Sequence, residues 1–431
     1  MTSLPHEIKR LICDHADLDT VKALRLVSSS WANVGIEILF LPTFVIKSYA
    51  IDLQRLIAIG SSRNTAQQAA NIIRSLEFRD NKYDPTYLRK IFCSRHVQVS
   101  NYEEVHFVPD QREQAALDEI DLVIEQRRLD DKVLANKQEA ILLGGFRNVP
   151  RVHTIKFTFE NPFEQPLLKK VWDEYNLDAY RAPELEPGYV DLSSILSAAN
   201  RANLKIENFT HDLYNSSLLH EHERLGLHRF LTELKSLSLV INNIANRSED
   251  LDPTSGLRDL LISNPALEHL HIRFETLGRV NFNFIPTMQP NTGHMKSLRL
   301  LNISISPASF LSFFSSNASS LKNISIYNVD LLDPDPEFTW QDLLSQIRHN
   351  PDLAIDKFEL GGLIRSRKET WWGLPIYDNE WVKVDHGSWF AKGRRVPSVD
   401  NERTFELENF VLGRGGWPAE QTEEPRLPRM T

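Results

Sequence analysis

The chain has 431 residues and a net charge of −9, a length that allows a large buried core and more than one folded unit. Its acidic residues are spread along the sequence, and a nucleic-acid partner needs a basic face, so we do not expect one. The two cysteines, Cys13 and Cys93, provide neither a disulfide framework nor four zinc ligands. The sequence lacks a run of about 18 apolar residues, so we expect no membrane partner. With no signal-peptide pattern, we expect a cytoplasmic or nuclear protein.

Three short helices are predicted within the first forty residues. The first covers residues 4–14, the second is capped by Asp17 or Asp19, and the third follows Ser28–Ser30. The apolar residues that share a helix face are, in turn, Ile8, Leu11 and Ile12; Val21, Leu24 and Val27; and Trp31, Val34 and Ile38. A bundle of fewer than about 45 residues is marginally stable by itself, so we expect a partner to complete the apolar surface. The candidates for that surface are Leu4, Pro5, Ile8, Leu24, Val27 and Trp31.

This N-terminal pattern resembles an F-box. The residues that carry the resemblance are Leu4-Pro5-His6-Glu7-Ile8, Leu24-Arg25-Leu26-Val27-Ser28, Trp31 and Leu39-Phe40. One departure is Ser29-Ser30, where many F-boxes have a basic residue before the tryptophan. The resemblance implies docking onto the S-phase-kinase-associated adaptor protein, and through it onto a cullin, in a ubiquitin ligase. The alternative is a helical cap for the following domain, with Leu4, Val27 and Trp31 in its core.

A second pattern, large-x-x-large-x-large, recurs along the rest of the chain and predicts short, half-buried strands. The clear copies begin at Ile73, Val152, Leu234, Leu267, Leu298 and Leu321, and the weaker copies begin at Tyr102, Ile206 and Ile355. From Leu234 onward, successive copies are separated by 33, 31, 23 and 34 residues. Helical patterns at 256–263, 307–315 and 339–348 lie between them, so each unit is expected to contain one strand and one returning helix.

The series resembles irregular leucine-rich repeats, which often follow an F-box. The two resemblances together imply an α/β fold, in which a three-helix F-box precedes a leucine-rich-repeat-like solenoid with a parallel sheet and outer helices. The Asn or Cys usually found after the strand of such a repeat is mostly missing, so another α/β arrangement with similar strands stays open.

The expected organisation has four parts: an F-box at 1–45, a repeat domain at 46–360, an aromatic-rich C-terminal cap at 361–412 and a disordered tail at 413–431. The repeat domain is expected to carry two insertions. One, at 111–145, is a charged helix or helix pair that ends at Gly144-Gly145. The other, at 160–200, is a loop too long for a plain connection. The tryptophans of the cap, at 371, 372, 381 and 389, either cover the end of the repeat core or form a binding platform.

The sequence contains none of the common catalytic motifs. Neither a phosphate-binding G-x-x-x-x-G-K-[ST] nor a G-x-S-x-G nucleophile elbow is present. His220 and His222 are two residues apart and would point to different faces of a helix, so we expect no metal site there. We therefore expect no catalytic residue, no cofactor and no metal, and predict a substrate receptor of an SCF (cullin–RING) ubiquitin ligase that binds an unknown protein target. The alternatives are a protein-interaction scaffold that acts outside ubiquitin ligation and an enzyme with an unrecognised active site.

Overall fold

A computed structural model divides the chain into two compact units, one of residues 1–169 and 186–210 and the other of residues 170–185 and 211–431. The residues that the structure describes are 4–39, 42–47, 49–61, 70–81, 85–95, 109–134, 138–160, 163–170, 192–215, 233–242, 255–275, 280–281, 294–332, 338–365, 372–374 and 401–417. The expected strand at Tyr102 and the histidines His220 and His222 lie outside these residues.

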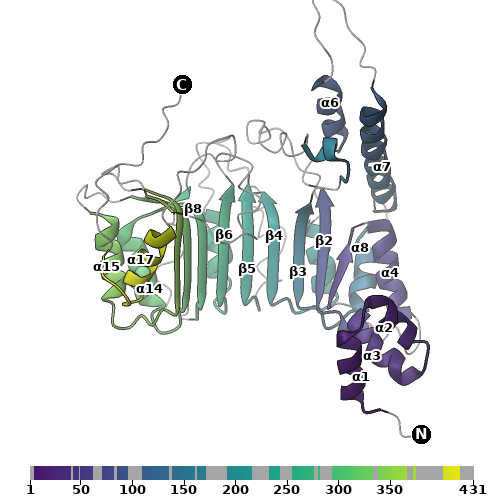
Figure 1. Ribbon diagram of the computed structural model, residues 1–431, viewed down its shortest axis with the longest axis horizontal. Coiled ribbons are helices and arrows are strands. Elements are labelled where there is room, and N and C mark those ends of the chain that lie inside the picture. Colours follow the sequence, from purple (N-terminus) through teal and green to yellow (C-terminus); the bar gives the residue numbers. More distant parts are fainter. Residues whose placement is uncertain are drawn as a thin grey trace, which may run out of the picture. The chain divides into compact units, whose positions relative to one another are not determined.

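The first unit begins with three helices and continues with strands and helices in alternation (Figure 1). Its elements are α1 (His6–His15), α2 (Leu18–Leu24), α3 (Ser29–Leu39), β1 (Thr43–Ile46), α4 (Tyr49–Ser61), β2 (Ser75–Asn81), α6 (Pro85–Arg95), α7 (Gln111–Leu134), α8 (Gln138–Arg147), β3 (Thr154–Glu160), α10 (Leu192–Arg201) and the start of β4 (Asn208–Asn215), whose residues from His211 onward belong to the second unit. The strand order is β1-β2-β3-β4, and β1, β2 and β3 run parallel. The predicted strands at Ile73, Val152 and Ile206 are confirmed, each beginning two residues after the start of its pattern.

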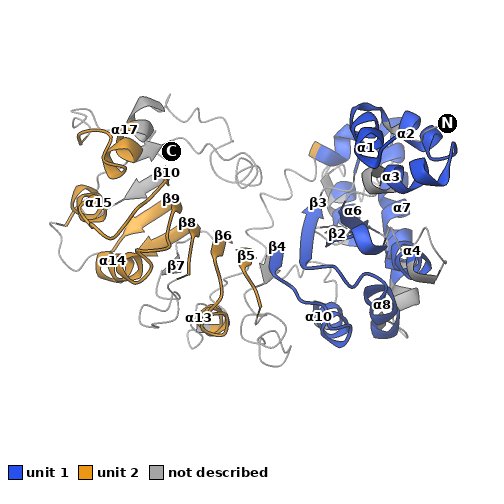
Figure 2. Ribbon diagram, turned by 90° about the horizontal axis from the view of Figure 1, so that it is seen from below, with its two compact units in different colours: residues 1–169, 186–210 blue, residues 170–185, 211–431 orange. Residues whose placement is uncertain are grey.

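The alternating pattern of β2 and β3 separates two faces of the sheet. Leu76 and Phe78 of β2 are buried, and Phe78 stacks on Phe157 of β3 with ring centroids 5.1 Å apart. Phe78 also contacts Tyr49 of α4 and Phe146 of α8, so this face packs against helices. Figure 2 shows α8 and α10 along that side of the strands. The polar residues that alternate with these apolar residues along β2 and β3 lie on the opposite face of the sheet.

The expectation that Gly144-Gly145 ends a helix is wrong. Both glycines lie inside α8, which continues to Arg147. A Cβ added to Gly145 would lie only 3.0 Å from Cδ2 of Leu56, a fully buried residue of α4. Gly145 therefore allows α4 and α8 to approach closely, which is the other common reason for glycine in a helix. The apolar side of α8 is part of the core, since Leu142 and Phe146 are buried.

The expected loop at 160–200 is wrong in its last part. Residues Leu192–Arg201 form α10, which packs on α8 and buries Ile195, Leu196, Ala198 and Ala199. At the start of the segment, Phe163 and Leu168 are also buried. The prolines and tyrosines at 162–189 obscured a helical pattern that begins only at Leu192.

The second unit repeats a strand followed by a helix. Its elements are β5 (Ser236–Asn242), α13 (Ser255–Ile262), β6 (His269–Glu275), β7 (Val280–Asn281), β8 (Ser297–Ile305), α14 (Pro307–Ser316), β9 (Asn323–Leu331), α15 (Trp340–Arg348), β10 (Lys357–Arg365), β11 (Trp372–Leu374) and α17 (Asn401–Val411). The strand order is β5-β6-β8-β9-β10-β11, with β7 paired to β8. Neighbouring strands from β5 to β10 are parallel, and β11 is antiparallel to β10. The predicted strands at Leu234, Leu267, Leu298, Leu321 and Ile355 and the three predicted helices between them are confirmed.

The helices α13, α14 and α15 lie on one side of the strands of the second unit (Figure 2). That side is a dense apolar core, in which Phe310 and Phe314 of α14 pack edge to face with ring centroids 4.5 Å apart. Each helix is followed by an asparagine, and a residue three or four positions later donates its backbone N–H to the carbonyl of that asparagine. The asparagines are Asn264, Asn317 and Asn350. This repeated corner turns the chain from a helix into the next strand.

Two further asparagines lie side by side in the middle of strands. Asn302 of β8 and Asn328 of β9 have φ values of 60° and 52°, in the left-handed region that asparagine tolerates better than most residues. The Asn302 amide donates to the carbonyl of Phe274 in β6 at 2.7 Å. A short asparagine row therefore exists within the strands, where the sequence pattern had left such a row in doubt.

The expected disordered tail is wrong for its first five residues, 413–417. Helix α17 packs against β10 and α15, and the chain leaves it at Gly413 with a φ of 72°. Beyond that glycine, Trp417 packs edge to face on Phe410, and Arg348 donates to the carbonyl of Gly415 at 2.6 Å. These two contacts join residues 413–417 to α17 and α15.

Candidate functional site

The helices α1, α2 and α3 form a small packed group with its own core. Helix α3 contacts both α1 and α2. Cys13, Val21 and Val34 are buried at the centre, one from each helix, and Ala16, Leu24 and Trp31 pack partly against them. This core is small for three helices, and of the apolar side chains that the structure describes in α1–α3 most are left at or near the surface.

Local interactions set the ends of these helices. The Asp17 carboxylate accepts a hydrogen bond from the backbone N–H of Thr20 at 2.7 Å and caps α2. That N–H also lowers the pKa of Asp17. Ser28 accepts from the N–H of Trp31 at 3.4 Å at the start of α3. Gly35 lies against the Arg25 side chain, where an added Cβ would be 2.5 Å from Cγ, so a glycine permits the crossing of α2 and α3.

The six residues predicted to contact a partner are not buried. Leu4, Pro5, Ile8 and Val27 are exposed, with Val27 67% and Ile8 43% accessible. Leu24 and Trp31 are half-buried because they also contribute to the core of α1–α3. The structure thus leaves apolar side chains from α1 and from the segment between α2 and α3 open to solvent.

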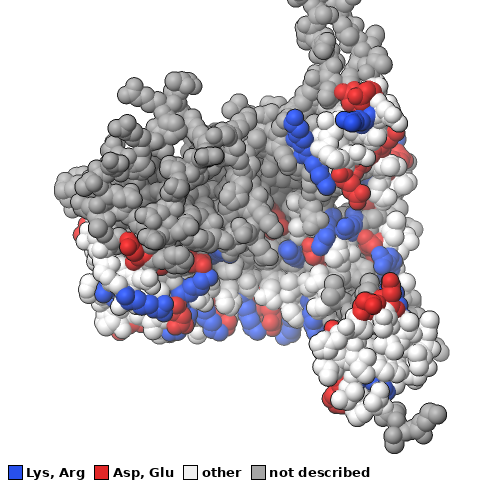
Figure 3. All heavy atoms as spheres, in the orientation of Figure 1, with Lys and Arg blue, Asp and Glu red and all other residues white. Residues whose placement is uncertain are grey.

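The sequence-based choice omitted three exposed apolar residues of the same group. Leu11 and Ile12 continue the stripe of Leu4 and Ile8 along α1 at helical spacing, and Leu26 is 89% accessible. Their pattern was visible in the sequence, but apolar spacing by itself does not separate a buried face from an exposed one. We name the set of Leu4, Ile8, Leu11, Ile12, Leu26 and Val27 the apolar surface of α1–α3. In the space-filling view this group presents a face with few charged side chains (Figure 3).

One charged side chain lies inside this helical group. Lys9 of α1 is only 4% accessible, and its ammonium donates to Oγ of Ser30 at 2.6 Å. The same nitrogen lies 5.8 Å from the centre of the Trp31 ring. The contacts join α1 to the beginning of α3. Cys13, in the core beside them, has a raised pKa because of its burial and the nearby Asp14, so its thiol is protonated at neutral pH.

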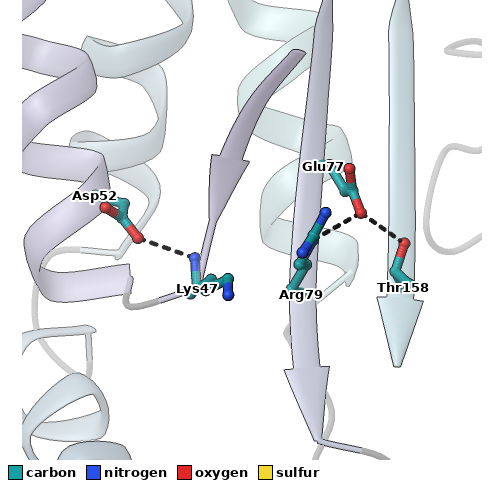
Figure 4. A network of polar contacts seen from close by, with 5 residues as sticks. All are labelled: Lys47, Asp52, Glu77, Arg79 and Thr158. Carbon is teal, nitrogen blue, oxygen red and sulfur yellow. Dashed lines mark hydrogen bonds and ion pairs between the residues drawn. The ribbon is translucent and has the colours of Figure 1, made fainter. Parts of the chain in front are cut away.

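The polar face of the sheet in the first unit carries a hydrogen-bonded group around Glu77 (Figure 4). Arg79 and Thr158 both donate to one carboxylate oxygen of Glu77, at 2.8 and 3.2 Å. Burial by itself raises the pKa of Glu77, but these donors and the nearby Lys156 outweigh it and the pKa is lowered. At the end of the edge strand β1, the backbone N–H of Lys47 donates to the carboxylate of Asp52 in α4 at 2.9 Å. The face is therefore charged and internally satisfied.

A similar polar group lies on the sheet of the second unit. Ser325 and Tyr327 of β9 donate to the same oxygen of Glu359 in β10, at 2.6 and 2.8 Å, and Lys357 pairs with the other oxygen. Arg299 of β8 lies over the Tyr327 ring. Burial, with Glu359 beside it, raises the pKa of Tyr327, so the phenol stays protonated and acts as a hydrogen-bond donor. Tyr327 is only 3% accessible, so its hydrogen bond to Glu359 joins β9 to β10 inside the sheet.

Within the described part of the chain, no three potential ligands of the types His, Cys, Asp and Glu come together as a metal site. His211 is fully buried, which lowers its pKa to about 3 and keeps the imidazole neutral. In those same residues no helix combines the length and apolar character needed to cross a membrane.

Comparison with protein families and curated proteins assigns the chain to no family. Neither a protein-family model nor a curated protein matches the sequence significantly. The features that bear on function are therefore the exposed apolar surface of α1–α3 and the polar sheet faces of the two units.

Proposed function

We propose that the chain is a substrate-receptor subunit of an SCF (cullin–RING) ubiquitin ligase. Its first three helices dock onto the S-phase-kinase-associated adaptor protein as an F-box, and the adaptor links the chain to a cullin. The rest of the chain, an irregular leucine-rich-repeat-like solenoid, holds a protein target in the cytoplasm or nucleus. The chain performs no chemistry itself, since holding a target near the catalytic subunits raises its effective concentration.

The observation that carries this proposal is the exposed apolar surface of α1–α3. Ile8 and Val27 are accessible, although each belongs to a pattern that would normally be buried in a helical bundle. Several exposed apolar side chains on one small group of helices commonly mark an interaction site. The F-box-like order of residues around Leu4-Pro5 and Trp31 supports the adaptor as the partner.

The polar sheet faces support the second half of the proposal. Arg79 and Lys156 in one unit, and Lys357 and Glu359 in the other, are at least partly accessible charged groups on the faces opposite the helices, whereas Glu77 and Tyr327 are buried. Accessible charges favour recognition of a polar protein surface, because a partner must supply matching charges. The chemistry of the target follows from those faces and from segments outside the described residues.

The docking proposal is tested with a variant that changes only exposed residues. Ile8→Asp combined with Val27→Asp places charges on the apolar surface of α1–α3, and we expect capture of the purified adaptor to fall by at least roughly thirtyfold, since a lost interface anchor costs about 2 kcal/mol. Leu4→Ala with Pro5→Ala should weaken capture in the same direction. Trp31→Ala is less informative, because Trp31 also packs in the core of α1–α3.

The matched control is Leu122→Asp, which places a charge at another exposed apolar residue of the first unit, 71% accessible on α7. Its capture should equal that of the wild type. Undiminished capture by Ile8→Asp/Val27→Asp would contradict docking through α1–α3. Reconstituted ubiquitin transfer with the adaptor, cullin and RING subunits then separates a ligase receptor from a scaffold that uses the same surface without ubiquitin transfer.

A further inference from the structure

The contact between Lys9 and Ser30 leaves a buried positive charge with neutral partners. The Lys9 ammonium, 4% accessible as a residue, has the Ser30 hydroxyl at 2.6 Å and the Trp31 ring at 5.8 Å. Among the described residues no carboxylate forms an ion pair with Lys9. An ammonium that has lost most of its water is destabilised unless a negative charge lies close to it. An anion at this position would therefore be bound more strongly than at an exposed lysine.

Ser30 is the group that can bring an anion there. Its side chain is exposed, and its Oγ already contacts the Lys9 ammonium. It is also the second residue of α3, an eleven-residue helix whose free N–H groups and positive end favour a negative charge. A phosphoryl group on this oxygen would have its own oxygens within reach of Lys9 without any movement of the backbone.

We propose that Ser30 is a phosphorylation site whose phosphoryl group pairs with Lys9 and prevents the apolar surface of α1–α3 from being covered by a partner. In the reaction, a protein kinase transfers the γ-phosphoryl group of ATP to Oγ of Ser30. The Oγ–P bond forms, the bond from the γ-phosphorus to the bridging oxygen breaks, ADP leaves and the hydroxyl proton goes to solvent. The product carries about −2 charge and three strong acceptor oxygens.

The effect on docking, which rests on the proposed function, follows from the neighbours of Ser30. Trp31 is the next residue, and the exposed Val27 and Leu26 lie just before it in the chain. A partner that covers these apolar side chains would have to remove water from the adjacent dianion, which is unfavourable. Conversely, a bound partner would shield Ser30, so phosphorylation and docking exclude each other and the kinase acts on the free chain.

The pairing with Lys9 is tested without any partner. We would prepare the full chain with phosphoserine at position 30 by genetic code expansion, and compare it with phosphoserine at position 29, which has the same charge and helix end but no contact with Lys9. Phosphoserine at 30 should raise the Tm of the first unit by about 2–4 °C, the shift expected for one added contact in a domain of this size. In a Lys9→Gln background the rise should disappear. An equal rise with phosphoserine at 29, or a rise that persists in Lys9→Gln, would overturn the pairing.

The docking arm uses the purified adaptor as the probe. The unmodified chain should bind, phosphoserine at 30 should lower the affinity at least tenfold, and Ser30→Ala should bind like the wild type. Unchanged affinity of the phosphorylated chain would overturn the switch. If the unmodified chain does not bind at all, the proposed function fails, and the melting comparison still decides the Lys9 pairing.

Mass spectrometry of the protein from its own cells, purified with phosphatase inhibitors, should place phosphate on Ser30, and its absence there would overturn Ser30 as a modification site.

Discussion

Helices α1 and α14 have the same length, ten residues, and both are amphipathic, yet their apolar faces end in opposite environments. In α14, Phe310, Phe313 and Phe314 are buried against the parallel strands of the second unit. In α1, Ile8, Leu11 and Ile12 are exposed, because the small core formed with α2 and α3 uses the other side of the helix. The comparison teaches that an apolar helix face becomes a core where a sheet covers it and stays exposed where none does.

The largest expected effect contrasts a covered with an uncovered apolar residue. Phe314→Ala should lower the free energy of unfolding of the second unit by about 3–5 kcal/mol, since it removes a fully buried aromatic ring and leaves a cavity. Ile8→Ala should change the stability of the first unit by less than about 0.5 kcal/mol. Urea unfolding of the full chain, followed separately for the two units, measures both. A comparable loss for Ile8→Ala would show that the α1 face is covered in the free protein.

A smaller effect is expected from glycines at helix crossings. Gly145→Ala would press a Cβ to 3.0 Å from the buried Leu56, and should destabilise the first unit by about 1 kcal/mol after the gain in helix propensity. Gly35→Ala would place a Cβ 2.5 Å from Cγ of Arg25, close to the backbone, so its loss should be at least as large as that of Gly145→Ala. Thermal unfolding of the two variants gives the comparison. A loss close to zero for Gly35→Ala would mean that α2 and α3 can move apart without cost.

A pH-dependent effect is expected in α17, a terminal helix whose apolar face is buried, unlike that of α1. Burial of its carboxylate, with Glu359 nearby, raises the pKa of Glu408 to about 7, while the carboxylate accepts from the N–H of Leu360. A carboxyl with a raised pKa stabilises the fold below its unfolded value of about 4.5, and that contribution is lost as the pH rises through 7. Glu408→Gln should therefore match the wild type at pH 4 and be the more stable at pH 8, when unfolding is followed at both values. A difference of the same size at both pH values would contradict the raised pKa.

Much of the architecture followed from local patterns. The strands at 236–242, 269–275, 297–305 and 323–331 were predictable because alternating apolar residues suit a half-buried strand, and the capping position of Asp17 was predictable from its residue type. The errors arose where one residue type serves two purposes. Gly144-Gly145 was interpreted as a helix end, whereas Gly145 allows a close helix contact. Residues 413–417 have the composition of a tail but pack on Phe410 and Arg348.

For the candidate site, the order of residues from Leu4 to Trp31 indicated a helical docking element, and the six named positions are all at least partly accessible. The sequence could not show that Leu26 is the most exposed apolar residue of the group, or that Lys9 is buried against Ser30. A lysine at the surface and one inside a bundle have the same local sequence signature, since burial depends on how the helices cross.

The sequence by itself determined the alternation of strands and helices and the three short N-terminal helices, because periodicity and capping act over a few residues. The tertiary structure decided which apolar faces are covered, which glycines lie at helix contacts and which charged groups lose their water. Those properties depend on what packs against each face, and such contacts join residues far apart in the chain. The apolar surface of α1–α3 and the buried Lys9 at Ser30 therefore emerged only when the helices were placed together.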